Sequence, residues 1–285
     1  MAPMLNTIPR IDAHQHYWDP ARGDYFWMDP ESPLCRTYAP ANFEPTLKRH
    51  GIAGTVLVQA APTREETEYL LAIADRTPSV LGVVGWIDFE DRLHSAWAER
   101  LAGHRKFKGV RPMIQDITDP KWVCHANLNW AFEMVAELRL CFDALVFPEH
   151  VPFLLKRLAR EPDLKVVIDH AAKPFIGERS FESWAADMTR LAKNTKALVK
   201  LSGLMTEATE DWSIDKLRPY ADHLLMTFGP TRMMWGSNWP VCLLAGSYER
   251  WVTTAENLTA GCTDAEKAGI FGGNAASFYD LDIAA

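Results

Sequence analysis

Two histidines separated by one residue, His14 and His16, are the side chains of this sequence best suited to chemistry. They follow an apolar segment at residues 8–13 that predicts a β-strand. Residues i and i+2 of a strand point to the same side. Both imidazoles could therefore bind one metal ion or polarise one carbonyl group. Nine histidines in 285 residues give roughly 0.3 such triplets by chance, so the position of the pair must carry the argument.

The strand that ends in this pair is the first of eight short, β-branched segments separated by helical patterns. The strands are predicted at residues 10–14, 54–59, 80–88, 107–111, 141–146, 165–170, 197–202 and 232–237. Thr63, followed by Glu66, predicts a capping box at the start of a helix over 64–76. Eight such units without a change of composition predict an α/β fold, one TIM-type (β/α)8 barrel domain over residues 1–285. An open doubly wound sheet is the alternative, although no Gly-x-Gly-x-x-Gly follows the first strand.

Polar side chains gather at the C-terminal ends of these strands, where a barrel of this type carries its active site. They are His14, His16, Gln59, Asp88, Lys108, Arg111, Glu149, His150, Asp169, His170, Lys173, Lys200, Ser202, Ser237 and Asn238. We interpret His170 as functional, against the alternative of a buried structural histidine. Asp12 and Asp169 would either orient an imidazole or hold a neighbouring loop. His150, at a helix start, is better explained as a cap.

Two long segments, residues 17–42 and 113–127, leave from the same ends of the strands. Loops longer than about 15 residues without structure of their own are usually functional. Several of the eleven tryptophans lie beside strand ends, and a flat indole face suits a sugar or another small ring. Trp18, Trp27 and Trp239 are the candidates for substrate binding, and the alternative for each is a place in the core.

The composition excludes several classes of protein. The net charge of -7 argues against a nucleic-acid or membrane-surface partner. The five cysteines form no Cys-x-x-Cys pair, which favours the reducing cytoplasm. No apolar run approaches 18 residues and no apolar leader is present. We expect a cytoplasmic protein that acts on a small molecule, and the oligomeric state stays open.

Five motifs that run from the first predicted strand to the last carry a family resemblance. They are Ile11-Asp-Ala-His-Gln-His-Tyr-Trp, Gly109-Val-Arg-Pro, Val167-Ile-Asp-His-Ala-Ala-Lys-Pro, Lys200-Leu-Ser-Gly and Trp235-Gly-Ser-Asn-Trp-Pro-Val. Together they resemble the amidohydrolase-related (amidohydrolase family 2) branch of the amidohydrolase superfamily, above all its sugar lactonases that open L-fuconolactone or L-rhamnonolactone. The resemblance implies a distorted (β/α)8 barrel and a hydrolase that opens a sugar (aldono) lactone to its sugar acid by water attack on the carbonyl.

The resemblance also implies which residues act. His14, His16, His170 and position 238 would surround the scissile carbonyl. Lactonases of this branch work with one divalent ion or none, so at most one weakly held and dispensable Zn²⁺ is expected, on His14 and His16. We add four candidates for binding substrate hydroxyl or carboxylate groups, whose alternative is a structural ion pair or hydrogen bond. They are Gln59, Lys108, Arg111 and Lys173.

Position 238 departs from the family pattern, which has Asp where this chain has Asn. In the family mechanism that Asp deprotonates the hydrolytic water, and an amide cannot do so near neutral pH. Loss of such a base costs about 10²–10⁴ in rate. One explanation is an engineered Asp→Asn change that traps the substrate. The other is a natural variant in which His170 or Glu149 is the base, or in which activity is lost.

Two other functions remain open on the same scaffold. One is metal-dependent decarboxylation of an aromatic acid, which would need additional carboxylate ligands to a tightly bound ion. The other is a protein that binds a sugar lactone without catalysis, which Asn238 makes more reasonable.

Overall fold

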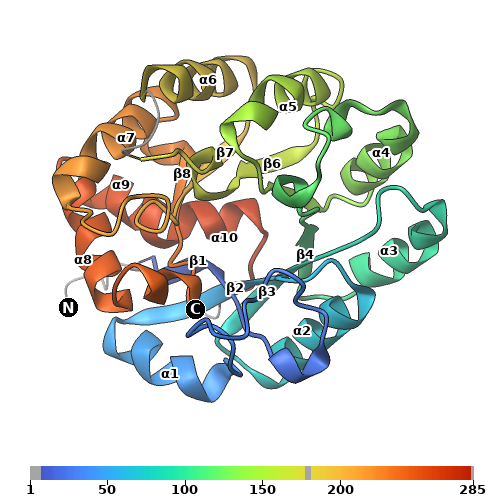
Figure 1. The fold of residues 1–285 in the computed structure, drawn as a ribbon, viewed down its shortest axis with the longest axis horizontal. Coiled ribbons are helices and arrows are strands. Elements are labelled where there is room, and N and C mark those ends of the chain that lie inside the picture. Colours follow the sequence, from blue (N-terminus) through green and yellow to red (C-terminus); the bar gives the residue numbers. More distant parts are fainter. Residues whose placement is uncertain (1–7, 177–180, 284–285) are drawn as a thin grey trace, which may run out of the picture.

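Eight parallel strands form one sheet in sequence order in the computed structural model, which describes residues 8–176 and 181–283 (Figure 1). The strands are β1 (Arg10–Gln15), β2 (Ile52–Val58), β3 (Val80–Gly85), β4 (Phe107–Val110), β5 (Cys141–Ala144), β6 (Lys165–Ile168), β7 (Leu198–Leu201) and β8 (Met233–Trp235). The predicted (β/α)8 architecture is confirmed. Strand β6 ends at Ile168 rather than at residue 170, because its polar tip turns away from the sheet.

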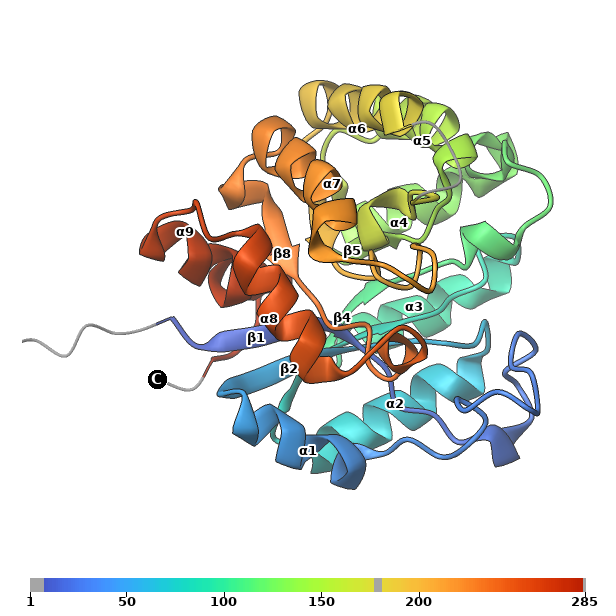
Figure 2. The same ribbon diagram turned by 60° about the vertical axis from the view of Figure 1, so that its left-hand side comes forward.

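Most of the helices form a ring around these strands, and α10 lies inside that ring (Figure 1). They are α1 (Pro40–Arg49), α2 (Arg64–Arg76), α3 (Ser95–Ala102), α4 (Asn129–Glu137), α5 (Val151–Leu158), α6 (Phe181–Asn194), α7 (Ile214–Thr227), α8 (Tyr248–Leu258), α9 (Asp264–Ala268) and α10 (Asn274–Phe278). Figure 2 shows α8 and α9 beside β1 and β8. Within the described ranges, no helix is long and apolar enough to cross a membrane.

The capping box predicted at the start of α2 forms only in part. The Thr63 side chain accepts a hydrogen bond from the Glu66 backbone N–H, at 3.1 Å. The Glu66 carboxylate does not return to Thr63. It accepts hydrogen bonds from the backbone amides of Ala60 and Ala61 instead, at 3.0 and 2.8 Å. Glu66 therefore holds the loop that follows β2, and the sequence spacing alone could not distinguish these two partners.

The C-terminal segment closes the N-terminal end of the barrel. The backbone oxygen of Phe278 accepts hydrogen bonds from Cys141 and Lys165, the first residues of β5 and β6. The apolar side chains of Phe278 and Tyr279 join the small apolar residues inside the barrel. A core of this kind makes the barrel a packed interior rather than a pore.

A β-bulge in β1 sets the direction of the histidine pair. Asp12 pairs with Thr55 and Gln15 pairs with Leu57, so β1 has one residue more than β2 over this interval. A bulge of this kind re-aims the side chains that follow it. Ala13 belongs to the apolar cluster inside the barrel, and His14 nevertheless contacts groups of β6 and β7 across the interior.

The barrel closes between β1 and the residues that follow β8. The backbone N–H of Asn238 donates to the carbonyl of His14, at 2.8 Å, and that of His16 donates to the carbonyl of Trp239, at 2.7 Å. Gly236 makes this approach feasible, because a Cβ atom there would lie 2.7 Å from Cβ of His14. Asn238 is thus fixed beside the histidine pair through its backbone, whatever its side chain does.

Candidate active site

A cavity of about 410 Å³ opens at the C-terminal ends of the strands. Both long loops contribute to its walls, the first with Trp18, Trp27 and Leu34 and the second with Met113 and Gln115. The polar and charged residues that border it are His16, Arg111, Gln115, His170, Lys173, Thr206, Glu207 and Asn238. A mostly apolar cavity with a few convergent polar groups is the usual form of a small-molecule site.

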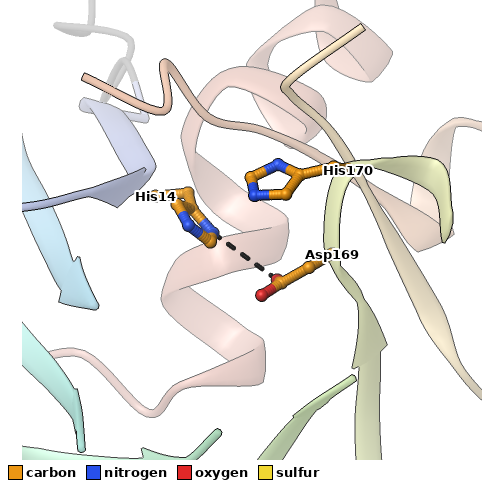
Figure 3. Close-up of side chains that lie close together, drawn as sticks. All are labelled: His14, Asp169 and His170. Atoms are coloured by element: carbon orange, nitrogen blue, oxygen red, sulfur yellow. Dashed lines mark ion pairs between the residues drawn. The ribbon is translucent and has the colours of Figure 1, made fainter. Parts of the chain in front are cut away.

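His14, on β1, is fully buried and is absent from the residues that border the cavity. Its Nδ1 is 3.5 Å from Oδ1 of Asp169, and its ring centre is 4.5 Å from that of His170 (Figure 3). The nitrogen or oxygen atoms that these three residues could offer to an ion lie within 4.8 Å of one another. The structure therefore brings His14, on β1, together with Asp169 and His170, which follow β6 and lie more than 150 residues later in the sequence.

A network of buried charges supports this group from below. The Lys200 ammonium lies 2.5 Å from Oδ2 of Asp143 and 2.9 Å from Oδ1 of Asp169, and all three side chains are inaccessible to solvent. The guanidinium of Arg111 is 3.3 Å from Oδ2 of Asp169. Burial by itself would raise the pKa of Asp169. Lys200, His14 and Arg111 together hold that pKa well below its usual range.

Lys200 also contacts the imidazole of His14. Its ammonium lies 3.0 Å from Nδ1 of that imidazole, and an ammonium can only donate. Burial, reinforced by Lys200, lowers the pKa of His14 well below its ordinary value, so the ring is neutral. Arg111, which likewise can only donate, lies 3.4 Å from Nε2 of the same ring. The neutral imidazole therefore lies between two cationic donors, one at each nitrogen.

His16 is fixed by partners on both of its ring nitrogens. Nδ1 lies 2.8 Å from the carbonyl oxygen of Val58 and so must donate to it. Burial, reinforced by Arg111, lowers the pKa of His16 to about 3, so Nε2 carries a lone pair at neutral pH. Nε2 lies 3.1 Å from Oδ1 of Asn238, so two acceptors face each other in this orientation of the amide. An amide can turn its NH₂ group toward that lone pair, whereas a carboxylate would be repelled by it.

His170 stands on an unusual left-handed turn. Four consecutive residues, His170 to Lys173, have φ between +48° and +57°, a conformation that costs L-residues roughly 1–2 kcal/mol each. Lys173 N–H closes the turn on the His170 carbonyl at 2.8 Å, and both side chains border the cavity. The ring of His170 is held by Ser202, whose Oγ is 2.8 Å from Nδ1.

The predicted site residues separate into two groups. The cavity is bordered by His16, His170, Asn238, Trp18, Trp27, Arg111 and Lys173. Lys108 lies elsewhere, because it is near the start of β4 and its ammonium donates to the carbonyl of Asp280, at 2.7 Å, at the opposite end of the barrel. Gln59 is buried and donates to the Arg111 carbonyl at 2.6 Å. Trp239 stacks on Phe43 with ring centres 4.2 Å apart and belongs to the core.

Four further polar residues near the strand ends received a predicted role beside the site, and the structure shows where each of them lies. Asp12 holds a loop, since its carboxylate accepts hydrogen bonds from Ser237 N–H at 2.8 Å and from the Tyr248 hydroxyl at 3.3 Å. Asp169 contacts the imidazole of His14. His150 caps a helix start as predicted, accepting from the Phe147 N–H at 3.0 Å. Glu149, named as an alternative base, is exposed and does not border the cavity.

The sequence argument missed Glu207. It follows β7 in a loop with no strand or helix signal, and its carboxylate borders the cavity 3.4 Å from Lys173. Burial raises the pKa of Glu207, against the effect of Lys173. Only the tertiary fold brings this loop over the site, so neither spacing nor periodicity could have found it.

The donors around His14 match a zinc ion in type but not in electrostatics. Two imidazoles and one carboxylate are ligands that zinc prefers. The Nδ1 of His14 and the Oδ1 of Asp169, however, are the atoms that the Lys200 ammonium contacts, at 3.0 and 2.9 Å. Arg111 adds a second positive charge to the same carboxylate. A divalent ion therefore does not fit this group while Lys200 keeps its place.

The profile of the amidohydrolase family matches residues 11–281 of the sequence. The chain belongs to the amidohydrolase family. An L-fucono-1,5-lactonase of Burkholderia ambifaria is 42% identical over 283 residues, which cover 96% of each chain. A second L-fucono-1,5-lactonase, from Burkholderia multivorans, is 34% identical over 289 residues, covering 95% of this chain and 96% of the relative.

Among solved structures, an amidohydrolase of Burkholderia multivorans with bound zinc superposes with a TM-score of 0.89. It is 34% identical, and the match covers 96% of this chain and 99% of that one. This likeness confirms the amidohydrolase barrel. The two alternatives, an aromatic-acid decarboxylase and a non-catalytic binding protein, are not favoured by these relatives.

Proposed function

We propose that this protein is a lactonase that opens an uncharged sugar lactone of the L-fucono-1,5-lactone type to its sugar acid. One observation carries the proposal. Two histidines, His16 and His170, border the cavity and a third, His14, lies next to them, and burial lowers the pKa of all three so that they are neutral. The identity to L-fucono-1,5-lactonases over nearly the whole chain supports it. A lactone contains one activated carbonyl, and hydrolysis needs a group that stabilises its oxygen and a group that accepts a proton from water.

Arg111 is the group that stabilises the carbonyl oxygen. Its guanidinium borders the cavity and is held from behind by Asp169 and by the backbone oxygen of Gln59. A donor fixed in this way needs no rearrangement when negative charge develops on the oxygen. The Nη1 atom of Arg111 also lies 3.4 Å from Nε2 of His14, which gives the guanidinium a third contact that holds it in place.

His170 is the group that accepts the proton. Burial holds its pKa well below the ordinary value, so the imidazole is unprotonated at neutral pH. When Nδ1 donates to the Ser202 hydroxyl, the other nitrogen is free to take a proton from water. Asn238 borders the cavity beside His16, where its amide can hold the water or a substrate hydroxyl without titrating. The base that Asn238 cannot supply is thus assigned to His170.

No step of this mechanism requires a metal ion. A zinc ion, if bound, would take His14, Asp169 and His170 and would polarise the carbonyl. It would have to displace the Lys200 ammonium from two of these residues, so we expect weak and dispensable binding. The sequence predicted His14 and His16 as the zinc ligands, and we propose this group in their place because both nitrogens of His16 already have neighbouring polar atoms.

The test is hydrolysis of L-fucono-, L-galactono- and L-rhamnonolactone by the unaltered chain and by Asn238→Asp, followed as acid release. We expect the unaltered chain to open at least one of them. If neither form opens any lactone, the lactonase proposal fails. If only Asn238→Asp is active, His170 is not the base and the unaltered chain is a lactone-binding protein.

A further inference from the structure

The cavity wall formed by the left-handed turn and the loop after β7 contains a pair of opposite charges that the mechanism above does not use. Oε1 of Glu207 lies 3.4 Å from Nζ of Lys173, and their side chains are only 15% and 18% exposed. Both residues border the cavity. Charged side chains this well shielded and directed at a binding cavity are expected to contact the ligand.

Lys173 is held firmly enough to position its partner. Its ammonium donates to Oε1 of Gln115, at 2.9 Å, and lies over the ring of Phe147, 5.0 Å from its centre. The second loop, the left-handed turn and the loop after β7 thus meet at this one ammonium. The Glu207 carboxylate is therefore presented to the cavity in a defined place rather than swinging in solvent.

A purely structural role does not account for the pair. The loop that carries Glu207 is already joined to the turn through its backbone, because Ile176 N–H donates to the Glu207 carbonyl at 3.0 Å. An isolated parallel bridge between Ile176 and Ala208 continues that connection. The two side chains are not needed to hold the segments together.

The charges of the wall indicate which ligands suit it. The described lining residues include two cations, Arg111 and Lys173, and one carboxylate, that of Glu207. Arg111 is already paired with Asp169, and Lys173 with Glu207. In the proposed mechanism Arg111 contacts the carbonyl oxygen, and Lys173 is neutralised by Glu207. Neither cation among the described lining residues is therefore left to receive an anionic substituent, whereas a carboxylate offers about four lone pairs to hydroxyl donors.

We propose that Glu207, positioned by Lys173, is the specificity-determining residue that accepts hydrogen bonds from two neighbouring hydroxyl groups of an uncharged lactone ring and excludes lactones that carry a carboxylate. The inference rests on the proposed lactonase function and adds the residue that selects its substrate. Charge-assisted hydrogen bonds are stronger and shorter than neutral ones, so this wall selects polyhydroxylated rings over plain ones.

The test compares Glu207→Gln with the unaltered protein on three lactones. L-fucono-1,5-lactone carries hydroxyls, δ-valerolactone carries none, and D-glucaro-1,4-lactone carries hydroxyls and a carboxylate. The matched control is Asp211→Asn, which removes the same charge from a carboxylate downstream in the chain whose side chain is 79% exposed and paired with Lys216. Thermal unfolding of each variant establishes that it is folded.

We expect Glu207→Gln to lower kcat/KM on L-fucono-1,5-lactone about 10- to 100-fold, mainly through KM, since a hydrogen bond to a charged group is lost. Turnover of δ-valerolactone should stay within about twofold, and D-glucaro-1,4-lactone should become a better substrate. Asp211→Asn should change none of these values. An equal fall of kcat on all three lactones would make Glu207 a general base instead, and no change on any of them would make the pair structural; either result overturns the proposal.

Binding of L-fucose, measured by calorimetry, separates this inference from the lactonase proposal. L-fucose carries the ring hydroxyls but no lactone carbonyl, so its binding does not depend on hydrolysis. If the unaltered protein opens no lactone but binds L-fucose and Glu207→Gln does not, the proposed function fails while the hydroxyl site stands. If lactones are opened and L-fucose binds both proteins equally, the function stands and the hydroxyl site fails.

Discussion

The ammonium of Lys200 lies 3.0 Å from Nδ1 of His14, and 186 residues separate the two in the chain. This contact places a permanent donor against the nitrogen that would otherwise be available to a cation. The other nitrogen of the ring, Nε2, faces a second cationic donor, Arg111, at 3.4 Å. The positive charge that a metal would bring to this barrel is thus already supplied by a side chain of β7.

Removal of this charge should weaken the fold. Lys200→Met leaves Asp143 and Asp169 buried without their shared cation, and breaking a buried ion pair typically costs about 3–5 kcal/mol. We expect a loss of this size in the free energy of unfolding, measured by urea denaturation. Lys216→Met, which breaks the exposed pair with Asp211, should change it by less than about 1 kcal/mol. Equal losses in the free energy of unfolding for the two substitutions would show that the buried network contributes no more stability than an exposed ion pair.

Chelation should leave the activity intact. Because the Lys200 ammonium contacts both Nδ1 of His14 and Oδ1 of Asp169, we expect dialysis against EDTA to change kcat by less than about twofold, with less than one zinc per chain by elemental analysis before dialysis. Loss of activity on chelation, restored by added Zn²⁺, would contradict the assignment of the carbonyl oxygen to Arg111.

His170 should be needed for turnover rather than for folding. His170→Asn removes the proton acceptor but keeps a polar group of similar shape next to Ser202. We expect kcat to fall by about 10²–10⁴ while the thermal unfolding temperature changes little. His125→Asn, an exposed histidine paired with Asp119, serves as the control and should retain full activity. A fall in kcat of less than tenfold in His170→Asn would mean that another residue is the base.

The pH profile should lack the transition expected of an ordinary histidine. Burial lowers the pKa of His14, His16 and His170, in each case below the usual value near 6.5. A lowered pKa means that protonation, and with it the loss of the acceptor on His170, begins only at more acidic pH. We expect kcat/KM to show no acid limb centred near 6.5. Titration of the Glu207 carboxyl could also produce an acid limb in the kcat/KM profile, and Glu207→Gln is the control for it. An acid limb near pH 6.5 that persists in this variant would refute the assignment of neutral histidines.

Gly203 should be intolerant of a side chain. It has φ of +70°, and a Cβ atom there would lie 2.8 Å from Cγ of His170. Gly203→Ala should therefore displace the imidazole and lower kcat by about 10- to 100-fold, besides costing roughly 1–2 kcal/mol for the left-handed backbone. In Gly261→Ala the new methyl group has no neighbour within 4 Å, and activity should be unchanged. Comparable kinetics of the two variants would mean that the position of His170 is not critical.

Much of the architecture was predictable because the strands are short, β-branched runs with clear helical patterns between them. The convergence of His14 and His170 followed from their places at strand ends. Lys108 was misplaced because it stands near the start of β4, where a side chain faces the other end of the barrel. A closer count along that strand would have separated it from Arg111.

Other parts of the site depend on tertiary structure that no local pattern records. The bulge in β1 rather than simple alternation directs His14 inward. Gln59 and Trp239 are residue types that often contact ligands. In this fold the Gln59 side chain is hydrogen-bonded to the Arg111 backbone, and the Trp239 ring is stacked on Phe43. Glu207 is set over the cavity by a loop whose course depends on Ile176.

The left-handed turn at His170–Lys173 also limits how this enzyme could be changed. In the proposed mechanism its first side chain accepts the proton and its last side chain positions Glu207, and two fully buried alanines form the rigid spacer between them. A mutation that relaxes the spacer would alter speed and selectivity together. Substitutions that adapt the cavity to a new lactone without disturbing His170 are therefore expected in the two long loops. There Trp27, Leu34 and Met113 shape the cavity and lie far from His170 in the sequence.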